Sequence, residues 1–242
     1  MAKAKRKKAL VICNGELLQG PRLRALAEDA DIIACADGGA NQAKKYGIFP
    51  DMIVGDLDSI EKKAKNYFRK VKMICNTNDD QTDLEKVLDV LLAKGVNEVT
   101  VVGATGRRTD HTITNFSILK KYHRKCTLRY LDAHCEISLV DRATKFSGRK
   151  GELISLAPLG KVEGITTRGL KYRLRNEALD VGVREGQSNV IVSNPVEISV
   201  KRGTLLLFRI HSLQRARLSR PRQSVRGQAG PVSRVSGGAS SC

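Results

Sequence analysis

Short apolar segments alternate with segments of helical periodicity from residue 9 to about residue 142. The apolar segments include ALVICN (9–14), DIIACAD (31–37) and EVTVVGA (98–104), which are hydrophobic along most of their length. Strands of this kind have to be covered on both faces, which is typical of a parallel sheet whose connections are helices. The alternation therefore predicts an α/β domain with a parallel sheet over residues 9–142.

The clearest predicted helix is TDLEKVLDVLLAKG, residues 82–95. Its leucines and valines at 84, 87, 88, 91 and 92 have helical spacing and form one apolar stripe. Thr82 and Glu85 have the spacing of a capping box, and Gly95 is a natural stop. The other predicted helices span 21–30, 38–47 and a segment that begins near Asp110, and the other predicted strands span 51–56, 72–76 and 127–132.

The pattern changes after about residue 144. Short β-type segments are separated by Gly, Pro and Asn, and no segment has clear helical periodicity. This favours a small antiparallel β-sandwich or barrel over residues 144–211. We expect its strands near 152–157, 161–167, 170–174, 189–193, 196–200 and 204–210.

Much of the net charge of +18 lies at the two ends of the chain. Residues 1–8 carry five cations, and residues 212–242 carry six arginines and no acid. We expect a basic N-terminal extension (1–8) and a disordered, low-complexity C-terminal tail (212–242), with nucleic-acid binding by these ends as the less favoured alternative.

The cysteines and the apolar segments predict a cytoplasmic protein. The six cysteines show no C-x-x-C pairing, and those at 13, 35, 75, 126 and 135 lie in or beside apolar runs, which predicts reduced core residues. We expect no signal peptide and no membrane span, because the apolar run after residue 8 is short and no segment reaches about 18 apolar residues.

Aspartates gather where the predicted parallel strands end. Asp56 and Asp58 follow the third strand, and Asp83 opens the helix after the fourth. Residues i and i+2 of an extended segment point the same way, so the first two carboxylates can converge. Open parallel sheets bind ligands beyond the carboxyl ends of their strands, and Mg²⁺ prefers carboxylate oxygens, so these aspartates predict a Mg²⁺ site. Turn and cap roles are the alternative.

Glycine-rich segments at the same edge suit a phosphate. DGGAN (37–41) and GATGRRTDH (103–111) place small residues where helices begin, so that the backbone can approach an anion. Arg108 is the expected phosphate ligand, whereas Arg107 either adds a contact or faces solvent. His111 and Asn115 lie one turn apart and can meet the same ligand, although a hydrogen-bonded structural role is equally open for His111. An acidic cluster beside a phosphate cradle favours nucleotide-dependent phosphoryl or pyrophosphoryl transfer.

Four segments resemble, in order and spacing, the motifs of the thiamin pyrophosphokinase family: CADGGAN (35–41), PDMIVGDLDS (50–59), DDQTDLEKVL (79–88) and GATGRRTDHTITN (103–115). GLKYRL (169–174) and EGQSN (185–189) resemble parts of its C-terminal half. The resemblance covers about residues 9–210. It implies an α/β nucleotide-binding domain followed by a β-sandwich that binds thiamin, in a homodimer with active sites between the subunits. It also implies transfer of pyrophosphate from ATP to the hydroxyl of thiamin, with Mg²⁺, giving thiamin diphosphate and AMP.

The resemblance also implies roles for individual residues. The catalytic and metal-binding carboxylates are Asp56, Asp58 and Asp83, and either Asp58 or Asp83 is the expected base. The residues implied around the nucleotide are Asp37, Gly38, Gly39, Asn41, Thr105, Gly106, Arg108, Asp110, His111 and Asn115. The residues implied for thiamin are Gln81, Ser188 and Asn189, of which the last two are equally suited to a hairpin turn.

Two rival functions stay open. One is a pyrophosphokinase acting on another small alcohol, such as a hydroxymethylpterin. The other is a non-enzymatic nucleic-acid-binding protein that uses the basic ends, against which the acidic cluster argues because it would repel phosphates. The chain has no Trp to stack on thiamin, and Phe208 is the aromatic residue near the last strand.

Overall fold

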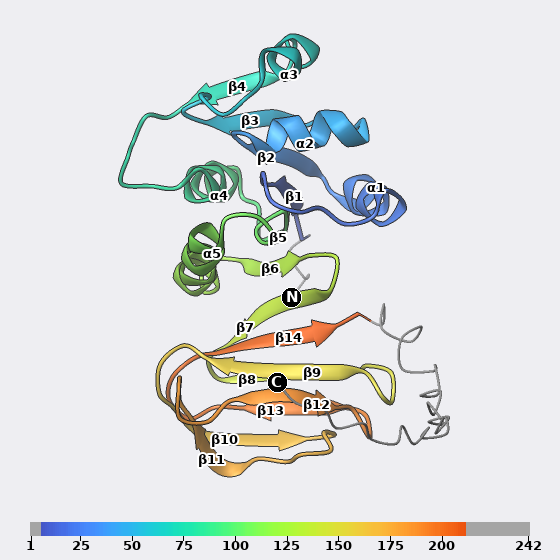
Figure 1. The fold of residues 1–242 in the computed structure, drawn as a ribbon, viewed down its shortest axis with the longest axis vertical. Helices are drawn as coiled ribbons and strands as arrows, with labels where there is room; N and C mark the ends of the chain where they lie inside the picture. Colours follow the sequence, from blue (N-terminus) through green and yellow to red (C-terminus); the bar gives the residue numbers. More distant parts are fainter. Residues whose placement is uncertain (1–5, 212–242) are drawn as a thin grey trace, which may run out of the picture. The chain divides into compact units, whose positions relative to one another are not determined.

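The main feature of the fold is one ten-stranded sheet (Figure 1). The computed structural model describes residues 6–211. Six strands at one end of the sheet pair in parallel, in the order β6-β5-β1-β2-β3-β4. They are β1 (Lys8–Ile12), β2 (Ile32–Ala36), β3 (Met52–Gly55), β4 (Lys72–Cys75), β5 (Glu98–Val102) and β6 (Thr127–Leu131). The parallel sheet expected from the apolar alternation is therefore confirmed.

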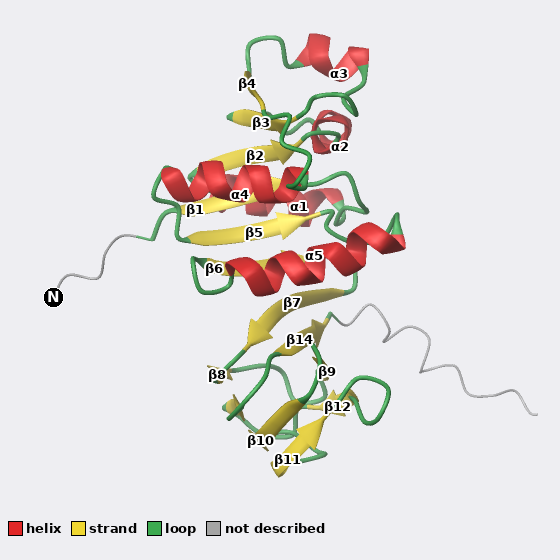
Figure 2. Cartoon of the chain, turned by 90° about the vertical axis from the view of Figure 1, so that its left-hand side faces the viewer, coloured by secondary structure: helices red, strands yellow, loops and turns green. Residues whose placement is uncertain are grey.

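Five helices cover the two faces of these parallel strands. They are α1 (Gly20–Asp29), α2 (Gly39–Tyr46), α3 (Lys62–Tyr67), α4 (Asp83–Ala93) and α5 (Thr109–Tyr122). Helices α4 and α5 pack on one face through Leu88, Leu91 and Leu119, and α1 to α3 pack on the other through residues such as Leu23 and Phe68 (Figure 2). The capping box of Thr82 and Glu85 starts α4 as predicted. Helix α3 was not expected from the sequence.

The C-terminal half adds antiparallel strands. Strands β7 (Cys135–Val140), β9 (Leu153–Pro158), β12 (Gly186–Val190) and β14 (Leu205–Ile210) complete the large sheet. Strands β8 (Ala143–Phe146), β10 (Val162–Arg168), β11 (Arg175–Leu179) and β13 (Val196–Ser199) form a second sheet. Buried residues of both sheets, such as Ile154, Leu205, Ile165 and Ile198, share one core, so this half is a β-sandwich as expected.

Several sequence expectations for this half were wrong in detail. Strands β7 and β8 were not expected. The segment 170–174 is not a strand but contributes one isolated bridge, between Leu170 and Ile191, and the strand that follows it is β11. One face of the sandwich belongs to the large sheet, because β7 pairs with β6 and carries the sheet onward from the parallel strands. The two halves of the chain therefore share a sheet.

The basic N-terminal extension ends earlier than expected. Lys8 begins β1, its backbone N–H donates to Asp31 Oδ2 at 2.8 Å, and Lys7 Nζ donates to the Lys94 carbonyl at 2.9 Å. Residues 1–5 and the Arg-rich tail 212–242 lie outside the described residues. Within residues 6–211, no helix is long and apolar enough to cross a membrane.

The described cysteines are all free thiols. Cys13, Cys35, Cys126 and Cys135 are buried, as the apolar sequence around them predicts. Cys75 is exposed, because β4 is the outermost strand of the sheet and Cys75 is its last residue. Its placement in the core was a wrong prediction.

Candidate active site

A cavity of about 710 Å³ opens at the carboxyl ends of β1, β2 and β5. The loop after β3 and the first turns of α4 and α5 complete its wall. In Figure 2, β2 and β5 point toward one edge of the sheet, and α5 begins there. Ligands of open α/β sheets bind at this position.

Most of the site residues expected from the sequence line this cavity. They are Asp37, Gly38, Asp56, Gln81, Asp83, Thr105, Arg108, Asp110, His111 and Asn115. Gly39, Asn41, Asp58, Gly106, Ser188 and Asn189 do not line it.

Three carboxylates form a cluster at the end of β2 and β3. One oxygen each from Asp37, Asp56 and Asp58 lies within 4.8 Å of the other two. Asp37 is 2% exposed, and its Oδ2 accepts the Ser59 N–H at 3.1 Å, whereas its Oδ1 is buried with no hydrogen-bond partner. Burial raises the pKa of Asp37, and the charges of Asp56 and Asp58 raise it further. A hard divalent cation would relieve this repulsion and satisfy the unpartnered oxygen.

The two carboxylates of the GDLDS segment converge through a turn. Strand β3 ends at Gly55, and Leu57 has a φ of +68°, so Asp56 and Asp58 do not belong to an extended segment as expected. The Asp58 N–H donates to Asp56 Oδ1 at 3.1 Å, which closes the turn. The predicted convergence occurs, but its predicted cause was wrong.

Asp83 lies beside this cluster and is not one of its three members. Its Oδ1 accepts from Lys86 Nζ at 3.3 Å. The missing side chain of Gly55 permits the approach, because a Cβ there would come within 2.6 Å of Asp37 Cβ and 3.1 Å of Asp83 Oδ1. Burial raises the pKa of Asp83 and the hydrogen bond from Lys86 opposes that rise. The geometry groups Asp37 with Asp56 and Asp58, and leaves Asp83 paired with the buried ammonium group of Lys86.

Another part of the cavity wall is made by the loops after β1 and β5. The Gly15 N–H donates to the Gly103 carbonyl at 2.8 Å, and a Cβ on Gly15 would overlap that carbonyl. Arg107 Nη1 donates to the backbone oxygen and to Oδ1 of Asn14, both at 3.2 Å. Arg107 therefore faces the cavity wall. This wall supplies the small residues and the positive charge that a phosphate requires.

The first turn of α5 carries the remaining expected nucleotide residues. Arg108 and Asp110 form an ion pair with each other, and the hydrogen bond from Arg108 lowers the pKa of Asp110 to about 2. Asn115 Nδ2 donates to the Ala104 carbonyl at 2.7 Å, which fixes the helix against the loop after β5. His111 is exposed at the cavity.

Two glycines of the expected phosphate segments have packing roles. A Cβ on Gly39 would overlap the Ile12 carbonyl, so Gly39 allows α2 to pack against β1. Gly106 has a φ of +92°, and a Cβ there would overlap the side chain of Glu16. Gly38, in contrast, borders the cavity as expected.

Asn41 acts as a clamp on the loop that carries the acidic cluster. Its Nδ2 donates to the Ser59 carbonyl at 2.9 Å, and its Oδ1 accepts the Glu61 N–H at 3.0 Å. Asn41 therefore holds the shape of that loop from outside the cavity.

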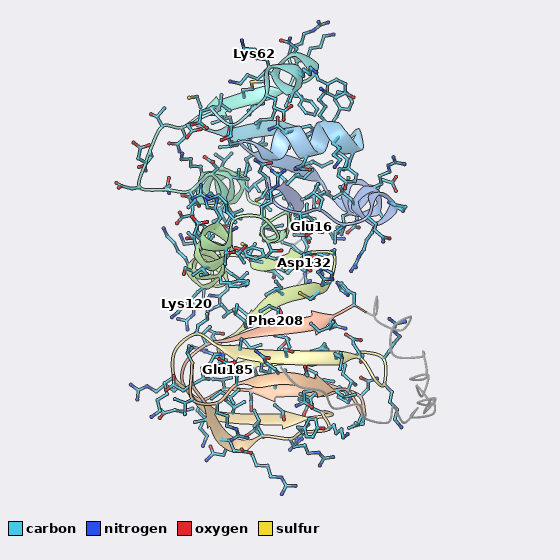
Figure 3. The ribbon with its side chains drawn as sticks, viewed as in Figure 1. Glu16, Lys62, Lys120, Asp132, Glu185 and Phe208 are labelled. Atoms are coloured by element: carbon cyan, nitrogen blue, oxygen red, sulfur yellow. The ribbon has the colours of Figure 1, made fainter. Side chains whose placement is uncertain are left out.

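Asn189 and Ser188 lie in the second half of the chain. Asn189 is buried, and its amide binds the backbone of Tyr172 on both sides, accepting the N–H at 2.9 Å and donating to the carbonyl at 2.6 Å. Ser188 is exposed with a φ of +56°. Tyr172 is 60% exposed. Phe208, labelled in Figure 3, is half-buried and packs edge-on against Phe116 of α5.

Lys86 is a site residue that the sequence reasoning missed. Lys86 lines the cavity although its side chain is only 4% exposed, and its spacing of three residues from Asp83 on a helix was the available signal.

A parallel sheet with an acidic cluster and a glycine-lined wall at its carboxyl edge is an arrangement typical of transferases of the kinase class. Solved structures with the same fold include thiamine pyrophosphokinase from Bacillus subtilis, with a TM-score of 0.75, 24% identity, and coverage of 86% of this chain and 100% of that one. The yeast thiamin pyrophosphokinase structure gives a TM-score of 0.76 at 21% identity, with coverage of 87% and 88%.

Sequence comparison carries the assignment from fold to family. The chain is 29% identical to thiamine pyrophosphokinase 1 of Arabidopsis thaliana over 87% of this chain and 88% of the relative. It is 28% identical to thiamine pyrophosphokinase 1 of Oryza sativa, over 79% and 83%. The family models for the thiamin pyrophosphokinase catalytic domain and vitamin B1 binding domain match residues 23–130 and 137–205. The chain belongs to the thiamin pyrophosphokinase family.

Proposed function

We propose that this protein transfers pyrophosphate from ATP to the hydroxyl of thiamin, giving thiamin diphosphate and AMP. In this reaction the oxygen of the thiamin hydroxyl forms a bond to the β-phosphorus, the bond between that phosphorus and the α,β-bridging oxygen breaks, and AMP leaves with the bridging oxygen. The observation that carries the proposal is the buried, unpartnered Oδ1 of Asp37 beside Asp56 and Asp58, in a cavity that Gly15 and Gly103 also line. The match to a vitamin B1 binding domain over residues 137–205 supports thiamin over a pterin.

The carboxylate cluster fits Mg²⁺, which is the co-ion we propose. Three carboxylates within 4.8 Å supply the hard oxygen ligands that Mg²⁺ prefers, so Asp37, Asp56 and Asp58 would hold it. When bound, Mg²⁺ neutralises charge on the polyphosphate. Asp37 thus takes the third position for which the sequence suggested Asp83.

We assign Asp83 as the base that accepts the hydroxyl proton. Its carboxylate stands apart from the three clustered acids, and burial raises its pKa toward the working range of a general base. The hydrogen bond from Lys86 opposes this rise in the pKa of Asp83, and the Lys86 ammonium adds positive charge to the cavity. Arg107 and Arg108 would bind the phosphates, the latter after release from Asp110.

We propose that the protein works as a homodimer in which the second half of one subunit completes the cavity of the other. Ser188 lies outside the cavity of its own chain, and exposed apolar side chains in this half, Tyr172, Val181 and Val183, suit a subunit contact. Tyr172, clasped by Asn189, is our candidate to stack on thiamin in place of Trp. The free thiols of the described cysteines support a cytoplasmic location.

The test is AMP formation by purified protein, with ATP, Mg²⁺ and either thiamin or a hydroxymethylpterin. We expect turnover with thiamin and loss of at least about 100-fold in Asp56→Asn, since one carboxylate of the cluster is neutralised. Glu163→Gln removes a carboxylate from the exposed surface of β10 and is the control that keeps full activity. Turnover with the pterin alone would mean that the pterin, and not thiamin, is the substrate. Unchanged activity in Asp56→Asn would mean that the metal binds elsewhere.

The nucleic-acid-binding alternative is not favoured by the family matches, and it can be tested directly. It predicts affinity for oligonucleotides that falls steeply with salt, and no AMP formation. Fluorescence anisotropy with labelled single- and double-stranded DNA and RNA separates the two functions.

A further inference from the structure

Helix α5 holds the loop before α4 through two parallel chains of hydrogen bonds. In the first, the Tyr122 hydroxyl donates to Asp89 Oδ1 at 2.8 Å, and Gln81 Nε2 donates to Asp89 Oδ2 at 2.8 Å. In the second, Lys121 Nζ pairs with Glu85 Oε1 at 2.7 Å, and Glu85 Oε2 accepts the Thr82 N–H at 2.9 Å. Two consecutive residues of α5 thus reach two consecutive residues of the loop, by way of acids one turn apart on α4.

The two chains have different consequences for the cavity. The chain through Glu85 is the capping box of α4 and fixes backbone. The chain through Asp89 ends on the side chain of Gln81, which lines the cavity, whereas Asp89 itself does not. Tyr122 is 1% exposed, so this chain is anchored in the core.

Asp89 also decides which way the Gln81 amide faces. A carboxylate can only accept hydrogen bonds, so the group that Gln81 directs at Asp89 is its NH₂. The carbonyl oxygen Oε1 is therefore directed away from Asp89. There it accepts a long contact of 3.4 Å from Asn78 Nδ2, which leaves acceptor capacity for a ligand.

We propose that Asp89 is a positioning residue for substrate specificity: it makes Gln81 an obligatory hydrogen-bond acceptor in the cavity. The group recognised is a hydrogen-bond donor on the organic substrate. This inference rests on the proposed function, under which the donor is the exocyclic amine of the thiamin pyrimidine. An analogue that carries oxygen in place of the amine presents an acceptor there and should react with a lower kcat/KM.

The substitution Asp89→Asn tests this without breaking the network. Asn Oδ1 can still accept from Tyr122, but its NH₂ then faces Gln81, so the Gln81 amide has to turn over and direct its own NH₂ at the ligand. The measurement is kcat/KM for thiamin and for the oxygen analogue, together with KM for ATP. We expect the preference for thiamin to fall at least about tenfold in Asp89→Asn, with KM for ATP unchanged. Lys121→Met breaks the parallel chain on the same helix and should keep the wild-type preference.

A second measurement tests the hydrogen bond between Gln81 and Asp89 without catalysis. The side-chain amide of Gln81, assigned by its loss in Gln81→Met, should show a ¹H–¹⁵N signal shifted by the carboxylate in the wild type and moved in Asp89→Asn. An unchanged preference in Asp89→Asn, or equal changes for thiamin and ATP, would overturn the proposal. If the wild type forms no AMP from thiamin, the proposed function fails. An unchanged Gln81 signal in Asp89→Asn would show that Asp89 does not orient the Gln81 amide.

Discussion

Replacing Asp37 by Asn should make the protein more stable without Mg²⁺ and less responsive to it. Asp37 is 2% exposed, and its Oδ1 is buried with no partner beside Asp56 and Asp58. Asn has nearly the same shape and no charge. Its NH₂ can donate to the neighbouring carboxylates, so the substitution removes one unpartnered acceptor and one like charge.

The size of the effect follows from that unpartnered oxygen. A buried acceptor without a partner costs about 1–3 kcal/mol, so Asp37→Asn should raise the free energy of unfolding by about that amount in the absence of Mg²⁺. A ligand present at about 100 times its Kd adds about 2.7 kcal/mol to the wild type, and most of this gain should be absent in the variant. The difference in free energy of unfolding between Asp37→Asn and the wild type should therefore narrow or change sign when Mg²⁺ is added.

The pH dependence gives the sign of the effect independently. The pKa of Asp37 is raised by folding, so the folded protein binds this proton more tightly than the unfolded chain. The stability contributed by protonation is fully present below the ordinary pKa of 3.8 and is lost as pH rises through the raised value in the folded state. The advantage of Asp37→Asn should accordingly grow over that interval and level off above it.

Urea unfolding followed by circular dichroism measures the free energy of unfolding of both proteins. Runs in EDTA, in Mg²⁺ and at several pH values give the stability without Mg²⁺, the gain from Mg²⁺ and the pH dependence. The control is Asp51→Ala. Asp51 Oδ2 accepts the backbone N–H of Ile33 at 2.7 Å and Ala has no acceptor for it, so this replacement should lower stability under every condition. A less stable Asp37→Asn variant in EDTA, with an undiminished response to Mg²⁺, would refute the reasoning.

Three further predictions concern Gly39, Thr82 and Lys86. Gly39→Ala should lower the free energy of unfolding by about 3 kcal/mol, because its Cβ overlaps the Ile12 carbonyl; thermal unfolding checks this, and Gly20→Ala, with its nearest neighbour at 3.9 Å, should be nearly neutral. Thr82→Ala should lose about 1 kcal/mol in urea unfolding, whereas Thr82→Ser keeps the cap; equal stability of the two would contradict the capping role. Lys86→Met should move the acidic limb of the pH–rate profile to higher pH, because the pKa of Asp83, raised by burial, loses the opposing hydrogen bond; an unmoved limb would remove Asp83 as the base.

The parallel half of the fold was predictable because its signals are local and agree with one another. Strands buried on both faces are apolar throughout, and α4 has both an apolar stripe and a capping box. The α3 helix was missed because only Ala64 of its six residues is buried, so it has no apolar periodicity. The junction of the two halves was missed because β6 and β7 are linked by a pairing that the sequence does not encode as a pattern.

The site was predictable as a set of strand-end residues and less so in its internal pairing. Asp56 and Asp83 line the same cavity as expected. The sequence did not reveal that Asp37 would join the acidic cluster, because this depends on Gly55 leaving room across two strands. The packing role of Gly39 and the clamp of Asn41 likewise depend on contacts with distant segments.

The last strand that the structure describes, β14, joins two parts of the large sheet. Strand β14 lies between β7 and β9, which have no other pairing with each other in the sheet order, so β9 and β12 join the large sheet only through it. During synthesis on the ribosome, residues 205–210 emerge after all the strands that they connect. Until they emerge, the nascent protein exposes the free edges of β7 and β9, which are sites of aberrant association between chains. Termination of translation before residue 205 should therefore yield an aggregating polypeptide instead of a shortened enzyme.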